Sequence, residues 1–123
     1  MSSITLRKLA AGALALTGLL HLILAPEYLD EQAYIGVLFI GGGLTSLALA
    51  AWLWAKDDAR AWSLSALVAG GMAIGFILSR TTGLPGFHEG EWELSGIVSL
   101  LLEAGVVGVA ISALRTPQPV TQS

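Results

Sequence analysis

Cysteine is absent from this chain of 123 residues, and charged side chains are scarce. Without a thiol, disulfide bonds, thiolate metal sites, cysteine nucleophiles and iron–sulfur ligation are all excluded. Only 12% of the residues are charged, against roughly 25% in ordinary soluble domains. The six basic residues never cluster, so the positive surface that nucleic-acid binding needs is missing. We therefore expect no nucleic-acid partner.

Recognisable catalytic patterns are missing as well. The sequence has no G-x-S-x-G, no phosphate-binding loop and no paired catalytic carboxylates, so it supports no enzyme class, and we expect no cofactor. A haem held by His21 and His88 is disfavoured because His88 falls in a loop beside glycine and proline. No H-x-x-x-H pair occurs, and we assign no metal ligands. A metal site on the outer face, at these histidines and nearby carboxylates, is our third hypothesis.

Hydrophobic residues are abundant, at 54% of the chain, and they gather in four stretches. A hydrocarbon core of roughly 30 Å requires about 20 apolar residues in helical form. The four stretches cover residues 9–25, 34–55, 62–79 and 94–114. Pro26 is expected to end the first, and the charged segments PEYLDEQ, KDDAR and RTTGLPGFHEGEWE connect them. The sequence predicts an all-α bundle of four transmembrane helices, one domain of residues 1–115, with a disordered tail at 116–123.

The basic start of the first stretch is also typical of a secretory signal peptide. Its apolar run is long for such a peptide, and the only A-x-A-like exit, Ile23-Leu24-Ala25, would place Pro26 directly after the cleavage site. We therefore expect a retained helix.

Basic residues near the ends of the stretches indicate the orientation. Five lie on one side of the predicted membrane: Arg7, Lys8, Lys56, Arg60 and Arg115. Arg80 alone lies on the other, so the positive-inside rule predicts that both termini are cytoplasmic and that the chain is a multi-pass protein of the cell membrane. Aromatic residues form a belt at each boundary: Trp52, Trp54 and Trp62 inside, and Tyr28, Tyr34 and Trp92 outside.

Small residues recur at helical spacing in the third and fourth stretches. In lipid, helices associate largely through close backbone contact at such residues. We predict a packing seam at Gly71, Gly75, Ser79, Gly96 and Ser99. Tolerance of weak helix formers in lipid is the alternative explanation for any single glycine.

Glu103 is the acidic residue nearest the middle of a predicted span. It lies about 14 Å below the outer end of the fourth stretch, at a rise of 1.5 Å per residue. Insertion of an acid at such a depth costs roughly 2.5–3.5 kcal/mol, so we expect Glu103 to face the bundle interior. Two roles are open: a hydrogen-bonding clamp between helices, or a proton or ion site.

His21 and Arg80 are the other candidate members of a polar site. Side chains lean toward the N-terminus of their own helix, which brings His21 and Glu103 closer than their depths in antiparallel helices suggest. A local hydrogen bond within the first helix is the alternative role for His21. Arg80 is a candidate partner for Glu93, Glu91 or His21, and the alternative is an interfacial side chain that extends to water.

Two resemblances bear on the architecture. The segment SRTTGLPGFHEGEWELSGIVSLLLE, with HLILAPEYL, resembles small prokaryotic four-helix membrane proteins without an established activity. This likeness implies that His21, Arg80, Gly83, Pro85 and Glu103 belong to a recurrent pattern. The chain is also similar in length and helix number to small multidrug exporters. Their essential glutamate belongs to the first helix, where this chain has only His21, so transport is not carried over.

The leading hypothesis is therefore a non-enzymatic membrane protein in the lipid bilayer. It would act by helix-mediated association, with itself or with a partner membrane protein, through its glycine-rich faces. The alternative is a small transporter or proton-coupled carrier that uses Glu103.

Overall fold

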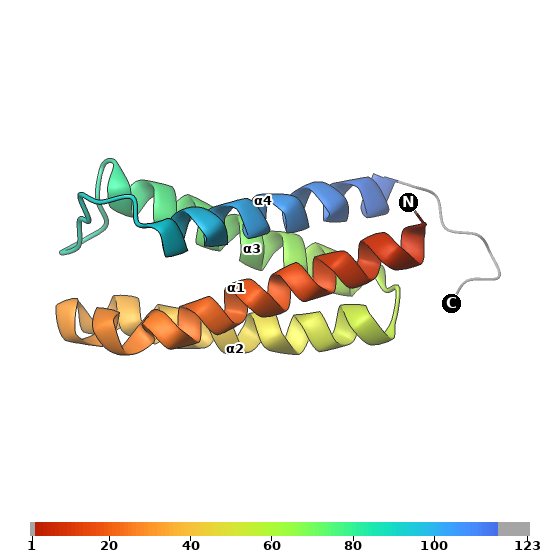
Figure 1. Ribbon diagram of the computed structural model, residues 1–123, viewed down its shortest axis with the longest axis horizontal. Helices are drawn as coiled ribbons and strands as arrows, with labels where there is room; N and C mark the ends of the chain where they lie inside the picture. The colour runs from red at the N-terminus through yellow and green to blue at the C-terminus, as the bar shows by residue number, and fades with distance from the viewer. Residues whose placement is uncertain (1, 116–123) are drawn as a thin grey trace.

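The computed structural model describes residues 2–115 as four helices, with two short connections and a longer one before the last helix (Figure 1). They are α1 (Ser3–Glu31), α2 (Ala33–Ala55), α3 (Ala59–Arg80) and α4 (Leu94–Arg115). Each is long and apolar enough to cross a membrane. The predicted all-helical, four-helix architecture is confirmed; the tail predicted at 116–123 lies outside the residues that the structure describes.

Side-chain caps fix two of the helix starts. Ser2 precedes α1 and accepts a hydrogen bond from the backbone N–H of Thr5 at 3.1 Å. Asp58 precedes α3 and accepts from the N–H of Arg60 at 2.8 Å. Such caps satisfy N–H groups that have no partner within the helix. Hydrogen bonds from the Arg60 guanidinium, and then from its N–H, lower the pKa of Asp58.

Pro26 does not end the first helix, contrary to our expectation. The helix continues through Pro26 to Glu31, so most of the predicted connection PEYLDEQ is helical. A proline removes one backbone hydrogen bond and does not by itself unwind the turns beyond it. Tyr28, in that last part of α1, is buried against Ile35 and Phe87, which holds the extension in place. Only Gln32, in an extended conformation, separates α1 from α2.

The helices pack as two hairpins, α1 with α2 and α3 with α4, which Figure 1 shows as two layers. Of the extensively packed pairs, α1 and α2 share the largest interface and α2 and α3 the smallest. An apolar core that includes Leu14, Leu53, Ala69 and Val106 fills the half of the bundle nearer the termini. A smaller cluster lies at the opposite end, around Tyr28.

We call the end that carries the start of α1 and the end of α4 the terminal end. At this end, the side chains of Arg7 and Lys8 contact Trp54 and the C-terminal end of α2. Arg7 donates to the backbone carbonyl groups of Leu53 and Trp54, the acceptors that a helix C-terminus leaves without partners. The ammonium group of Lys8 lies 4.7 Å from the centroid of the Trp54 ring. These contacts tie α1 to the end of α2.

At the opposite end, which we call the loop end, residues 81–93 fold over the junction of α1 and α2. Gly83 and Gly86 have φ values of +88° and +66°, a conformation that residues with a Cβ rarely adopt. Gln32 donates to the carbonyl of Gly86 at 2.9 Å, and the Tyr34 hydroxyl donates to the carbonyl of Pro85. The connection between α3 and α4 is thus an ordered cover over this end of the bundle.

Candidate functional site

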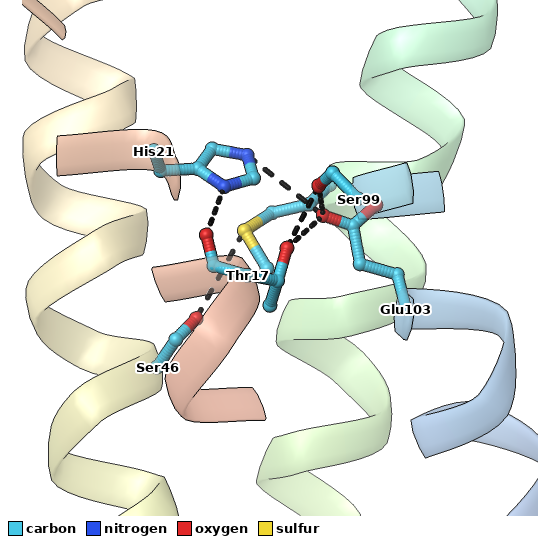
Figure 2. A network of polar contacts seen from close by, with 6 residues as sticks. Thr17, His21, Ser46, Ser99 and Glu103 are labelled. Carbon is cyan, nitrogen blue, oxygen red and sulfur yellow. Dashed lines mark hydrogen bonds and ion pairs between the residues drawn. The ribbon is translucent and has the colours of Figure 1, made fainter. Parts of the chain in front are cut away.

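Glu103 lies at the centre of a buried polar network between α1 and α4. Only 1% of the residue is exposed. Its Oε2 atom is hydrogen-bonded to the hydroxyl groups of Thr17 at 2.8 Å and Ser99 at 2.7 Å. Figure 2 shows these side chains pointing toward one another from the two helices. The expectation that Glu103 faces the bundle interior agrees with this placement.

The three oxygen atoms form a closed triangle, because the hydroxyls of Thr17 and Ser99 also lie 2.7 Å from each other. Each of the three contacts needs a hydrogen atom to be a hydrogen bond, and the two hydroxyl groups supply only two. A carboxyl proton on Glu103 supplies the third. The triangle is therefore fully satisfied when Glu103 is a neutral acid.

His21 faces the same carboxyl group from α1 (Figure 2). Its Nδ1 atom lies 2.7 Å from the backbone carbonyl oxygen of Thr17. A carbonyl oxygen only accepts, so Nδ1 is the donor and carries a hydrogen. Nε2 then lies 3.8 Å from Oε2 of Glu103. His21 thus combines the two roles that the sequence left open, the local hydrogen bond and the approach to Glu103.

Arg80 is buried beside two of its candidate partners, Glu91 and Glu93, and the alternative that it extends to water is wrong. Only 3% of its side chain is exposed. Its guanidinium donates to the carbonyl of Glu91 at 3.1 Å, to the Ser79 hydroxyl at 2.7 Å and to the Tyr28 hydroxyl at 3.1 Å. It also lies 3.6 Å from a carboxylate oxygen of Glu93. Arg80 therefore links α3, α1 and the segment before α4.

A cavity of about 340 Å³ lies between these two polar groups. Glu103 and His21 line one part of it, and Arg80 and Tyr28 line another. Most of the remaining wall is apolar, and Leu84, from the loop-end cover, contributes to it. Small-molecule sites span about 300–1,000 Å³, so the volume suits a small ligand.

The residues of the predicted packing seam do not share one interface. Gly71 and Gly75 line the cavity, and no atom lies within 4 Å of the position that a Cβ would occupy on either. Gly96 packs against the ring of Phe76. Ser79 accepts from Arg80 and Ser99 belongs to the Glu103 network, as described above. Close contact between helices occurs elsewhere, at Gly18 and Gly43.

Two site residues escaped the sequence analysis. Thr17 lies one helical turn before His21, and that spacing on an apolar helix is a signal that could have identified it. Tyr28 was assigned to the aromatic belt, and nothing local in the sequence distinguishes a belt tyrosine from a buried partner of Arg80.

The histidines and carboxylates do not gather into a metal site in the described part of the chain. Among residues 2–115, no group of three or more such side chains is placed to hold a metal ion. His88 instead lies with Nε2 3.0 Å from the carbonyl oxygen of Thr81. The metal hypothesis therefore has no geometric support there.

Comparison with known proteins adds no relative, since no protein-family model, curated protein or solved structure matches the chain.

Proposed function

We propose that this chain is a non-enzymatic, multi-pass protein of the cell membrane that binds a small lipophilic molecule in its cavity and couples the binding to a proton. The observation that carries the proposal is the buried His21–Glu103 pair at the cavity wall. This is the carrier hypothesis of the sequence analysis, and the cavity favours it over association alone.

Membrane insertion is supported by the outer surface of the bundle. Large apolar side chains point away from the core, among them Ile23 and Leu67 at 71% and 70% exposure. Lipid is the solvent that accepts such a surface, and the four helix lengths match a bilayer. The basic residues near the terminal end favour a cytoplasmic position for that end.

Proton coupling follows from the hydrogen positions around His21. With Nδ1 committed to the Thr17 carbonyl, a neutral His21 presents the lone pair of Nε2 toward Glu103. A lone pair facing an ionised carboxylate is repulsive, so at least one proton resides on Nε2 or on the carboxyl group. The oxygen triangle favours Glu103 as the site of that proton while the cavity is empty.

A ligand screen tests the proposal in lipid nanodiscs. Small lipophilic amines, alcohols, carboxylates and hydrocarbons are added to the wild-type protein, and the unfolding temperature is measured at several pH values. A ligand at 100 times its Kd stabilises the folded state by about 2.7 kcal/mol, a clear thermal shift. We expect at least one class to stabilise the wild type in a pH-dependent way.

Two variants complete the screen. Glu103→Gln keeps the size of the side chain and cannot release a proton, so the stabilisation should disappear. Glu27→Gln removes an exposed acid on the same protein, and this variant should still be stabilised by the ligand. If no class stabilised the wild type, or if Glu103→Gln responded as the wild type does, the proposed function would be contradicted.

Association remains a second candidate function because of the outer face of α4. Ala104, Gly105 and Gly108 are exposed there, and apart from the backbone of α4 itself no described atom lies within 4 Å of a Cβ built on either glycine. Ala104 and Gly108 are four residues apart, a spacing that lets a second helix approach closely. Single-molecule photobleaching in nanodiscs should then show dimers that Gly108→Leu separates; wild-type monomers would exclude this function.

A further inference from the structure

The cavity has one unobstructed side. At the loop end it is closed by Leu84 and Phe87, and at the terminal end by the core that includes Leu14 and Val106. Between α2 and α3, which share the smallest interface of the extensively packed pairs, the wall contains Gly42, Gly71 and Gly75.

Two apolar side chains mark this side as an opening. Leu38 of α2 and Leu67 of α3 line the cavity, yet they are 62% and 70% exposed. The cavity therefore reaches the outer surface between these helices, at a face that the proposed function places in lipid. An apolar rim of this kind admits molecules that are dissolved in the bilayer.

Next to Glu103, the donors of His21, Thr17 and Ser99 are already engaged within the protein. Nδ1 of His21 and both hydroxyls of the oxygen triangle are used within the protein. The hydrogen bonds of Glu103 all end on Oε2, and among the described residues none reaches Oε1. A ligand that bonds to Oε1 must therefore donate.

Arg80 is engaged mainly within the protein, although it lines the cavity. Its Nε, NH1 and NH2 groups are directed at Glu91, Ser79, Tyr28 and Glu93. Among the described residues that line the cavity, Glu103 is thus the acid that retains an oxygen atom without a hydrogen bond. The charge arrangement favours a cation over an anion.

We propose that the cavity binds a compact lipophilic amine, which enters between α2 and α3 and is held as an ammonium ion by Glu103. This inference rests on the proposed function and adds the ligand class and the route. The free base crosses the apolar rim and takes the carboxyl proton of Glu103: an N–H bond forms, the O–H bond breaks, and an ammonium–carboxylate pair remains. Relative to the ammonium ion in water, one proton is released for each amine bound.

The groups that face Glu103 from the neighbouring helices fit this exchange. His21 from α1 is the titratable one, and Thr17 and Ser99 can redirect their hydroxyl hydrogens to the new carboxylate. Arg80 of α3 is balanced by Glu93 and does not change its charge. The cavity therefore holds the same net charge before and after the amine binds.

Three cage compounds of equal size test the ligand class: 1-aminoadamantane, 1-adamantanol and 1-adamantanecarboxylate. Calorimetry is carried out on the full chain in phosphatidylcholine nanodiscs, with empty nanodiscs subtracted. Buffers of different ionisation enthalpy count the protons released. We expect saturable binding of the amine with release of about one proton, and weaker or no binding of the alcohol and the carboxylate.

Variants test the site and the route. Glu103→Gln should weaken amine binding by at least about 30-fold, the effect of removing one member of a buried charge pair. Gly71→Leu should slow amine binding because its side chain fills the opening, whereas Gly41→Leu, exposed on α2 and outside the cavity, should bind at the wild-type rate. Circular dichroism and the unfolding temperature verify that each variant is folded. If Gly71→Leu bound the amine as fast as Gly41→Leu does, the route would be wrong.

The outcomes separate this inference from the proposed function. Glu103-dependent binding of the alcohol or the carboxylate in preference to the amine, or amine binding without proton release, would overturn the ligand class while the cavity remained a binding site. If none of the three cage compounds bound while another class of compound stabilised the protein in the ligand screen, the proposed ligand class would also be overturned. Failure of every compound in both experiments would overturn both proposals.

Discussion

Gly18 of α1 and Gly43 of α2 meet backbone to backbone where these helices cross. A Cβ on Gly18 would stand 2.9 Å from the carbonyl oxygen of Gly43, and a Cβ on Gly43 would stand 2.8 Å from that of Gly18. Real Cβ atoms essentially never come so close to another heavy atom. The largest helix interface of the bundle therefore depends on these two glycines.

The first prediction concerns this crossing. Gly43→Ala should lower the free energy of unfolding by about 1–3 kcal/mol, the usual effect of overpacking a close contact. Gly75→Ala is the matched control, because a methyl group there meets nothing within 4 Å. The measurement is reversible unfolding in mixed micelles. Equal stability of the two variants would show that the crossing tolerates a methyl group.

A second prediction concerns Arg80. Arg80→Met keeps the length of the side chain and removes every donor, which leaves Glu93 and the Tyr28 hydroxyl without their shared partner. Hydrogen bonds to charged groups contribute about 1.5–3 kcal/mol, and we expect a loss of stability in that range. Arg60→Met, at a site where the side chain is 79% exposed, should have no measurable effect. Similar unfolding curves for both variants would place Arg80 outside the structural framework.

The third prediction separates the size of Glu103 from its hydrogen bonding. Glu103→Leu removes the acceptor of the Thr17 and Ser99 hydroxyls and should lower stability by roughly 1–2 kcal/mol, the scale of an interhelical hydrogen bond in lipid. Glu103→Gln retains an acceptor oxygen and should be closer to the wild type. Thermal unfolding in nanodiscs measures both. A leucine variant as stable as the wild type would mean that the network contributes nothing to folding.

Much of the fold was predictable because helix length and hydropathy are local properties. The four helices and the position of the long loop follow from runs of apolar residues and from glycine and proline. The extension of α1 through Pro26 was not predictable in this way. It depends on contacts of Tyr28 with Ile35 and Phe87, which only the assembled bundle brings together.

The candidate site was predictable in part for the same reason. Depth and helix direction indicated that Glu103 and His21 could approach each other. Which residues face the cavity or a neighbouring helix also depends on the rotation of each helix about its axis. Because the helices carry many small residues, the sequence does not determine that rotation. Gly75 therefore looked like a contact residue although it lines the cavity, whereas the true crossing at Gly18 and Gly43 was missed.

A fourth prediction tests the orientation in the membrane. The chain has no cysteine, so single cysteines can be introduced without a background. In intact cells, an impermeant thiol reagent should label Gly90→Cys at the loop end and leave Lys56→Cys at the terminal end unlabelled. Both positions are exposed in the bundle. Labelling of both, or of Lys56→Cys alone, would contradict cytoplasmic termini.

The central claim is that one proton belongs to the His21–Glu103 pair, and nitrogen NMR of the His21 ring in lipid bilayers tests it most directly. His21 and His88 are the only histidines, so a His88→Gln background leaves a single imidazole signal. We predict a neutral ring in the empty cavity, with the hydrogen on Nδ1 and none on Nε2, because the oxygen triangle keeps the shared proton on Glu103. Hydrogens on both ring nitrogens, or a neutral ring with its hydrogen on Nε2, would contradict the account.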